Sequence, residues 1–286
     1  LRLIMRDLCA LADLSEVTRT TTSLAEETLN FALNHLNAWM QQDYGIPMDI
    51  DSREPQELLV IGMGKLGGGE LNVSSDIDLV FVYPEEGVTS GPRSISNHEY
   101  FDRLCRKLSA AISAMTENGF VFRVDTRLRP YGESGPLAVS FAMLENYFIT
   151  QGREWERYAW IKARVVCGNR GEELMQLARP LVFRKYLDYA AFNSMRGLHG
   201  QVRQEVQRRD MSENIKLGPG GIREIEFLAQ VFQLIRGGRE SELRIRPTLA
   251  VLEKLVGLNL LPEQAAGELR DEYVFLRNLE HRLQYL

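Results

Sequence analysis

The chain has 286 residues, of which 44% are hydrophobic and 26% charged, a balance typical of a globular protein with a substantial core. The formal net charge of -5 argues against nucleic-acid binding as the main function, although a local basic patch is compatible with it. The three cysteines lie far apart, which favours a reducing cytoplasm over a disulfide framework or a zinc site, and no apolar run approaches the ~18 residues of a membrane span.

The first segment, residues 1 to about 45, has a helical pattern. Ser23 and Glu26 have the S-x-x-E spacing of a capping box, and Gly45 predicts the end of a helix. The chain begins at Leu1 rather than at Met, and its final segment is still helical in pattern at Leu286. We therefore expect a fragment that is truncated at both ends.

The middle segment has the pattern of a small α/β unit. The apolar run LLVIGM (58–63) predicts a strand, and the glycine cluster GMGKLGGGE and the polar spacer LNVSS follow it. A second predicted strand, 77–83, ends before Pro84, and a helix is expected to begin at Ser96. FVFRVD (120–125) is a third predicted strand, followed by a loop rich in glycine and proline.

After about Ser140 no run has a convincing strand pattern. Seven runs predict helices: SFAMLENYFITQ, EWERYAWIKARVV, EELMQLARPLVF, SMRGLHGQVRQEVQRR, IREIEFLAQVFQLIRG, RPTLAVLEKLVG and PEQAAGELRDEYVFLRNLEHRLQYL. The expected fold class is therefore α+β, with N-terminal helices, a small mixed sheet and an all-α part behind it.

Two carboxylates open the second predicted strand. Asp76 and Asp78 are separated by one residue, so their side chains should point to the same face and repel each other. A divalent cation would offset this repulsion, and Mg²⁺ prefers carboxylate oxygens. Asp125 ends the third predicted strand and would complete a three-acid cluster if the two strands are neighbours. Such a cluster can hold two ions around a phosphoryl centre.

Glycines precede these acids. Gly67–Gly69 would let the backbone approach a phosphate group, whose oxygens exposed N–H groups can bind. Lys65 supplies a positive charge, and Arg127 and Arg129 follow Asp125 at a spacing that places both on one face. The pattern is neither a Walker A loop nor a dinucleotide fingerprint, because no G-K-[ST] follows and a polar spacer stands where the fingerprint requires a helix.

Other features are interpreted as structural. The cluster Gly218–Gly221 precedes a predicted helix and is interpreted as a tight turn, with anion binding as the alternative. Glu226 is one of two acids that favour the dipole of that helix at its start. Trp155, Tyr158 and Trp160 are interpreted as core anchors rather than base-stacking platforms. The histidines stand singly, which argues against zinc and against an HD-type hydrolase.

The two glycines and the D-x-D pair resemble the signature of the DNA polymerase β-like nucleotidyltransferase superfamily. From Glu57 into the last helices, longer blocks resemble the family of bifunctional glutamine synthetase adenylyltransferase/adenylyl-removing enzymes. These blocks are GMGKLGGGELNVSSDIDLVFVYPEEG, FVFRVDTRLRPYGESGPL, QGREWERYAWIKARVV and IKLGPGGIREIEFLAQVFQLIRGGRE. That family has two related modules, of which the N-terminal one removes AMP and the C-terminal one adds it. The forms ELNVSSDIDL, GESGP and IREIEF with RGGRE are similar to the removing module.

With this resemblance the chain divides into three expected parts. Residues 1–55 would be an N-terminal helical segment, 56–140 the nucleotidyltransferase catalytic core and 141–286 a helical domain. The resemblance implies phosphorolysis, in which inorganic phosphate attacks the AMP on a glutamine synthetase tyrosine and releases ADP, and so regulates nitrogen assimilation. A phosphate nucleophile is already anionic near neutral pH and needs no strong general base.

The resemblance also implies roles for six residues, and three further residues are candidates by their positive charge and position in the sequence. The expected catalytic acids and ligands of Mg²⁺ are Asp76, Asp78 and Asp125. The residues expected to contact phosphate groups are Gly67 and Gly68, through their backbone, and Ser75. The candidates for binding the incoming phosphate are Lys65, Arg127 and Arg129.

Two alternatives stay open on the sequence. The same fold could add AMP from ATP to a glutamine synthetase tyrosine, with the same acids. Alternatively, an inactive fragment could be a binding module whose helical half docks glutamine synthetase or the PII signal protein. The expected partners are thus adenylylated glutamine synthetase, the PII protein, phosphate and ADP or ATP, with no nucleic acid and no membrane.

Overall fold

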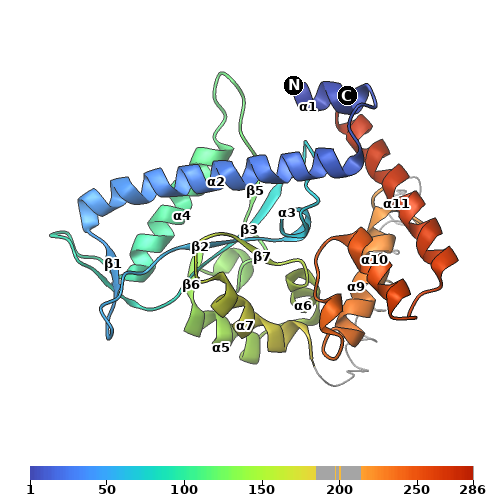
Figure 1. The fold of residues 1–286 in the computed structure, drawn as a ribbon. Helices are drawn as coiled ribbons and strands as arrows, with labels where there is room; N and C mark the ends of the chain where they lie inside the picture. The colour runs from blue at the N-terminus through green and yellow to red at the C-terminus, as the bar shows by residue number, and fades with distance from the viewer. Residues whose placement is uncertain (185–196, 198–199, 201–213, 286) are drawn as a thin grey trace.

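The computed structural model describes residues 1–184, 197, 200 and 214–285 (Figure 1). The predicted helix SMRGLHGQVRQEVQRR lies outside the described residues except for two positions. Among the helices that are described, none is both long and apolar enough to cross a membrane.

The N-terminal helices are α1 (Arg2–Leu8) and the long α2 (Leu14–Tyr44). The predicted capping box at Ser23 is wrong, because α2 begins earlier, at the carboxylate of Asp13, which accepts a 2.7 Å hydrogen bond from the backbone N–H of Glu16. The predicted end is confirmed at Gly45, whose φ of 81° favours glycine.

The main sheet is mixed and has the strand order β5-β3-β2-β7, with β6 also paired to β3. Its strands are β2 (Leu59–Gly62), β3 (Ile77–Tyr83), β5 (Val124–Asp125), β6 (Ala138–Ser140) and β7 (Arg164–Cys167). β3 is antiparallel to β2 and parallel to β5 and β6, and β7 is antiparallel to β2. The α+β fold class predicted from the sequence is confirmed.

The prediction that no strand follows Ser140 is wrong. The run EWERYAWIKARVV begins as α6 (Glu154–Trp160), but its end forms β7 and pairs with β2. Val165 and Val166 are β-branched and suit a strand, and the edge of β2 gives them hydrogen-bond partners that a sequence pattern does not show. The division into parts at 55 and 140 stays a prediction.

A second, two-stranded antiparallel sheet and a helix complete the first half. β1 (Pro47–Asp49) pairs with β4 (Gly87–Thr89), and α4 (Asn97–Ser113) follows. The predicted start of α4 is confirmed, because the Ser96 hydroxyl accepts a 3.1 Å hydrogen bond from the Glu99 backbone N–H.

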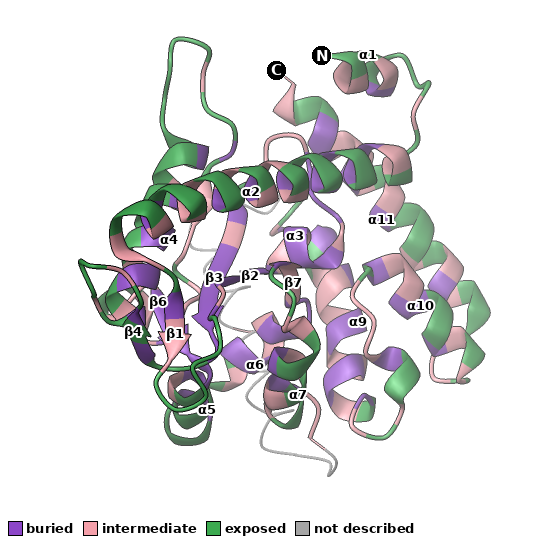
Figure 2. Ribbon diagram, turned by 60° about the vertical axis from the view of Figure 1, so that its left-hand side comes forward, coloured by how far each residue is buried: buried purple, intermediate pink, exposed green. Residues whose placement is uncertain are grey.

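Helices cover both faces of the sheet (Figure 1). Because side chains alternate along a strand, Val60 and Phe81 pack with α2 and α4 on one face, whereas Ile61 and Val80 pack with α5, α6 and α7 on the other. The strands are therefore buried on both sides, while the outer face of α2 is exposed (Figure 2).

The second half is not all-α as predicted, because it contains β7, but its other described elements are helical. These are α5 (Phe141–Thr150), α6, α7 (Gly171–Val182), α9 (Ile222–Arg236), the short η2 (Ser241–Leu243), α10 (Thr248–Gly257) and α11 (Glu263–Gln284). α9, α10 and α11 share a core of their own, which includes Ile225, Leu252 and Tyr273. α11 also reaches back toward α1 and the start of α2 (Figure 1).

Candidate active site

The three predicted carboxylates meet at one edge of the sheet. The parallel register of β3 and β5 places Asp78 directly beside Asp125, and Asp76 lies two residues before Asp78, just ahead of β3. All three line the same cavity of about 770 Å³. The expectation that the two strands are neighbours is therefore confirmed.

Asp78 is the most perturbed of these acids. Its pKa is raised to about 6, first by burial and then by repulsion from Asp125 and Asp76. Gly64, at a φ of +51°, lies close by, since a Cβ at Gly64 would be 3.0 Å from the Asp78 Oδ2. The Asp78 carboxylate therefore packs against the backbone at Gly64, and its burial there makes the ionised form unfavourable.

Arginines neutralise the other two acids. Asp76 is paired with Arg123, whose Nη2 also donates to the Ser74 carbonyl at 2.6 Å. Arg127 Nε donates to Asp125 Oδ2 at 2.9 Å, and this hydrogen bond lowers the pKa of Asp125.

The site fits Mg²⁺ by the type of its donors. Carboxylate oxygens are the ligands that Mg²⁺ prefers, and three carboxylates, those of Asp76, Asp78 and Asp125, line this cavity. However, among the described residues no group of three or more His, Cys, Asp and Glu side chains is arranged to hold a metal ion. Arg123 and Arg127 occupy carboxylate oxygens that an ion would need.

The glycine cluster differs from the expected loop. Residues Gly64–Gly68 form the short helix α3 instead of a loop, whereas the polar spacer 71–75 is not helical, as expected. Gly67 and Gly68 are buried in α3, and a Cβ at Gly67 would lie 1.9 Å from the Lys162 carbonyl oxygen. This contact explains why glycine is needed there. The predicted phosphate contacts of Gly67 and Gly68 stay a prediction, whereas Ser75 does line the cavity.

The three predicted phosphate-binding cations occupy different places. Lys65 lines the cavity but is paired with Glu280 of α11, with Nζ 2.8 Å from Oε1. Burial, more than any other cause, lowers its pKa to about 8. Arg127 lines the cavity and is largely exposed. Arg129 is absent from the described cavity wall, and it donates to the carbonyl oxygens of Thr126 and Glu133, so it holds its own loop.

Another wall of the cavity comes from α6 and α9. Of the three predicted core anchors, Trp160 is buried in the core as expected, but Trp155 and Tyr158 line the cavity. The interpretation as a core anchor is therefore wrong for Trp155, which is exposed, whereas Tyr158 lines the cavity and also packs against the core that contains Trp160. Phe227 and Gln230 of α9 lie on the same wall and were missed by the sequence reasoning.

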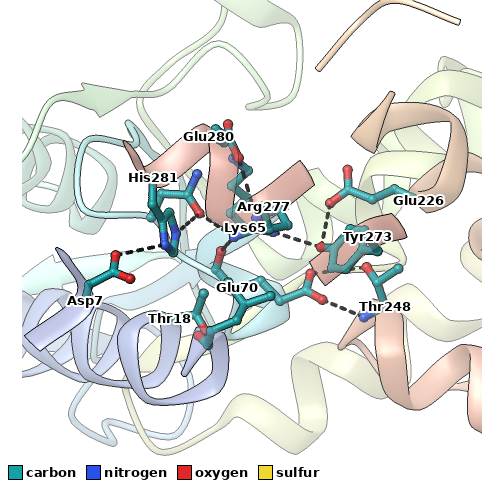
Figure 3. Close-up of polar contacts among 12 residues, drawn as sticks. Asp7, Thr18, Lys65, Glu70, Glu226, Thr248, Tyr273, Arg277, Glu280 and His281 are labelled. Carbon is teal, nitrogen blue, oxygen red and sulfur yellow. Dashed lines mark hydrogen bonds and ion pairs between the residues drawn. The ribbon is translucent and has the colours of Figure 1, made fainter. Parts of the chain in front are cut away.

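A buried ionic network joins this wall to α3 and the segment after it (Figure 3). Lys162 Nζ is 2.7 Å from Glu70 Oε2 and 3.4 Å from Glu226 Oε1, and it contacts Thr248 Oγ1 at 3.1 Å. Burial alone would lower the pKa of Lys162, but Glu226 and Glu70 outweigh it and raise the pKa. Glu226 thus does more than favour the helix dipole.

A second part of the network fixes the loop that leads to the acids. Arg277 of α11 donates to the Glu70 carbonyl oxygen at 2.6 Å and to the side chain of Asn72. His281 Nε2 lies 3.0 Å from the same Asn72 Oδ1, and its Nδ1 is 3.4 Å from Asp7 Oδ2 (Figure 3). The spacing of Arg277, Glu280 and His281 on one helix face was the available sequence signal for a buried polar contact.

Comparison of the sequence with protein families finds two matches. The sequence profile of the glutamate-ammonia ligase adenylyltransferase family matches residues 1–178, and that of the GlnD PII-uridylyltransferase family matches residues 196–286.

Curated relatives match over the whole chain. Proteins named bifunctional glutamine synthetase adenylyltransferase/adenylyl-removing enzyme are 63% identical in Chromobacterium violaceum, 61% in Nitrosomonas eutropha and 53% in Pseudomonas aeruginosa, each over 100% of this chain. The aligned region is 32%, 31% and 29% of these relatives, so the chain spans about a third of their length.

Proposed function

This chain belongs to the glutamate-ammonia ligase adenylyltransferase family, and we propose that it removes AMP from an adenylylated glutamine synthetase tyrosine by phosphorolysis. Inorganic phosphate would enter and ADP would leave, which would regulate nitrogen assimilation. The observation that carries the proposal is the register that sets Asp78 beside Asp125, with Asp76 on the wall of the same cavity.

The chemistry requires little acid–base assistance. An oxygen of inorganic phosphate forms a bond to the phosphorus of AMP, and the bond from that phosphorus to the tyrosine oxygen breaks. The phenolate leaves and takes a proton from solvent, since a phenol has a pKa of about 10. Catalysis then consists of positioning the groups and stabilising negative charge.

Metal binding and phosphate binding are assigned to different residues of this chain. Asp76, Asp78 and Asp125 would hold Mg²⁺, which when bound supplies Lewis-acid stabilisation of the phosphoryl oxygens. Arg127 is exposed to the cavity and is the candidate for the incoming phosphate, because a guanidinium can donate two parallel hydrogen bonds to it. Ser75 lines the cavity near Asp76, where it can contact the phosphate of AMP.

The test is incubation of the 286-residue chain with adenylylated glutamine synthetase, Mg²⁺ and phosphate. We expect ADP to form at a rate that depends on the phosphate concentration. Consumption of ATP with no requirement for phosphate would instead support the adding reaction. No turnover in either direction, with the partner protein bound, would favour a binding module.

The two arginines after Asp125 provide a matched pair of variants. Arg127→Lys should raise the KM for phosphate about tenfold, because Lys cannot reproduce the bidentate contact, and should leave binding of the adenylylated protein unchanged. Arg129→Lys should keep the parent KM for phosphate, because Arg129 hydrogen-bonds its own loop. Rates measured against phosphate concentration decide this, and equal effects of the two changes would remove Arg127 from the phosphate site.

A further inference from the structure

The segment between α4 and β5 exposes large apolar side chains beside the candidate active site. Met115, Phe120 and Val121 are 73%, 41% and 51% exposed. Single exposed apolar residues are common on protein surfaces, whereas several in one short loop form a cluster that indicates an interaction site. This segment, residues 114–121, is the apolar loop, and it projects from the fold (Figure 1).

Hydrogen bonds hold the apolar loop at its tip and at its base. At the tip, Thr116 and Gly119 exchange backbone hydrogen bonds of 2.9 and 3.0 Å, and Gly119 has a φ of 92°. At the base, the N–H groups of Val121 and Phe122 donate to the Ile112 carbonyl oxygen at 3.2 and 3.1 Å. A partner that binds this loop therefore does not have to order it first, which favours affinity.

The turn sets two of the apolar side chains opposite each other. Thr116 and Gly119 form an antiparallel bridge, so Met115 and Phe120 are the next pair along the two arms of the turn. Side chains of such a pair are close enough to form one surface. Val121 follows Phe120 and extends the exposed apolar surface.

The apolar loop is continuous with the wall of the cavity. The Arg123 guanidinium carbon lies 5.6 Å from the centroid of the Phe120 ring. The same guanidinium is paired with Asp76, and Arg123 lines the cavity that contains the three acids. A molecule that covers the opening beside Asp76 therefore meets the apolar loop next.

The substrate of the proposed reaction is itself a protein. A tyrosine side chain is short, so a phosphoryl group on it can reach Asp78 only if the surface of the protein lies against the edge of the cavity. Apolar side chains beside that tyrosine would leave water on contact with Met115, Phe120 and Val121. A phosphate ion or a nucleotide has no such contact to make, because none of the three belongs to the described cavity wall.

We propose that Met115, Phe120 and Val121 form the docking surface for the adenylylated protein, and that they contact apolar side chains beside its modified tyrosine. The inference rests on the proposed function and adds to it the place where the protein substrate is held. It assigns the apolar loop to binding of the protein and leaves the chemical step to the cavity.

The test compares two substrates that contain the same bond, adenylylated glutamine synthetase and free O-adenylyl-tyrosine. The double variant Met115→Ser with Phe120→Ser should raise the KM for the protein, relative to that for the free amino acid, about tenfold. Surface plasmon resonance in phosphate-free buffer, where phosphorolysis cannot occur, should show about tenfold weaker binding of the adenylylated protein.

Two further variants serve as controls. Phe275→Ser removes another exposed phenylalanine, on α11 and 62% exposed, and should keep the parent KM and affinity. The single change Met115→Ser leaves Phe120 against Arg123, and it should still weaken binding of the protein.

Four outcomes decide between docking and other roles. Parent affinity in the double variant, or the same loss in Phe275→Ser, would overturn the docking surface. An equal loss with O-adenylyl-tyrosine would also overturn it, because the change would then act through Arg123 on the cavity. Weaker protein binding in the double variant, together with a parent that binds the protein but forms no ADP, would support docking and refute phosphorolysis alone.

Discussion

Replacing Asp78 with Asn should reduce ADP formation to less than about one thousandth of the parent rate, a loss of about 4 kcal/mol of transition-state stabilisation. The amide keeps the shape of the side chain but removes the charge at the centre of the carboxylate cluster, next to Asp125. Steady-state rates at saturating phosphate and Mg²⁺ measure the effect. The exposed Asp43, at the end of α2, gives the control Asp43→Asn, which should keep the parent rate. A rate for Asp78→Asn near that of the parent would remove Asp78 from the reaction.

The same variant should be more stable than the parent at pH 7.5. The folded pKa of Asp78 is raised from 3.8 to about 6, so its ionisation costs stability above about pH 6 and costs none below about pH 4, where the carboxyl is protonated in both states. Asn should therefore gain about 1–2 kcal/mol at pH 7.5, and the gain should vanish near pH 4. Urea unfolding in chelator-containing buffer at the two pH values measures this. If Asp78→Asn is less stable than the parent at pH 7.5, the ionised form of Asp78 is not destabilised by burial and by repulsion from Asp76 and Asp125.

Replacing Lys162 with Met should lower the free energy of unfolding by about 3–5 kcal/mol. The ammonium group is buried, and it lies within ion-pair distance of both Glu70 and Glu226. Without it, the buried Glu70 and the partly buried Glu226 lose their common partner, and the contact between α9, α10 and the segment after α3 weakens.

Urea unfolding against the matched change Lys254→Met measures the effect. Lys254 is paired with Glu242 on the surface, at 2.8 Å, so its loss should cost no more than about 1 kcal/mol. Similar losses for the two variants would show that the network of Lys162 is not a stabilising contact.

The strand β3 and the acids at its start were predictable, because the patterns that indicate them lie within a few consecutive residues. The apolar run of β3 and the D-x-D spacing place Asp76 and Asp78 on one wall by geometry alone. Asp125 was predictable as the end of a strand, although β5 contains only Val124 and Asp125 in the structure. The helices α4, α9, α10 and α11 have clear amphipathic patterns, which explains why they were found.

The missed features depend on contacts between distant segments. Lys65 and Glu280 are separated by 215 positions, so no spacing rule could show that the predicted phosphate-binding lysine has a carboxylate partner. β7 follows directly after a helix and becomes a strand because β2 offers an open edge. Trp155 and Gln230 have ordinary helical positions, and only the packing of α6 against α9 shows that they face a cavity.

The most direct measurement of the central claim is the fate of labelled inorganic phosphate. The chain is incubated with adenylylated glutamine synthetase, Mg²⁺ and phosphate that carries ³²P. Phosphorolysis predicts that the label appears in the β-position of ADP, in equal amount to the tyrosine released, and that Asp78→Asn gives no labelled ADP. Unlabelled AMP as the product, with the label left in free phosphate, would contradict the account.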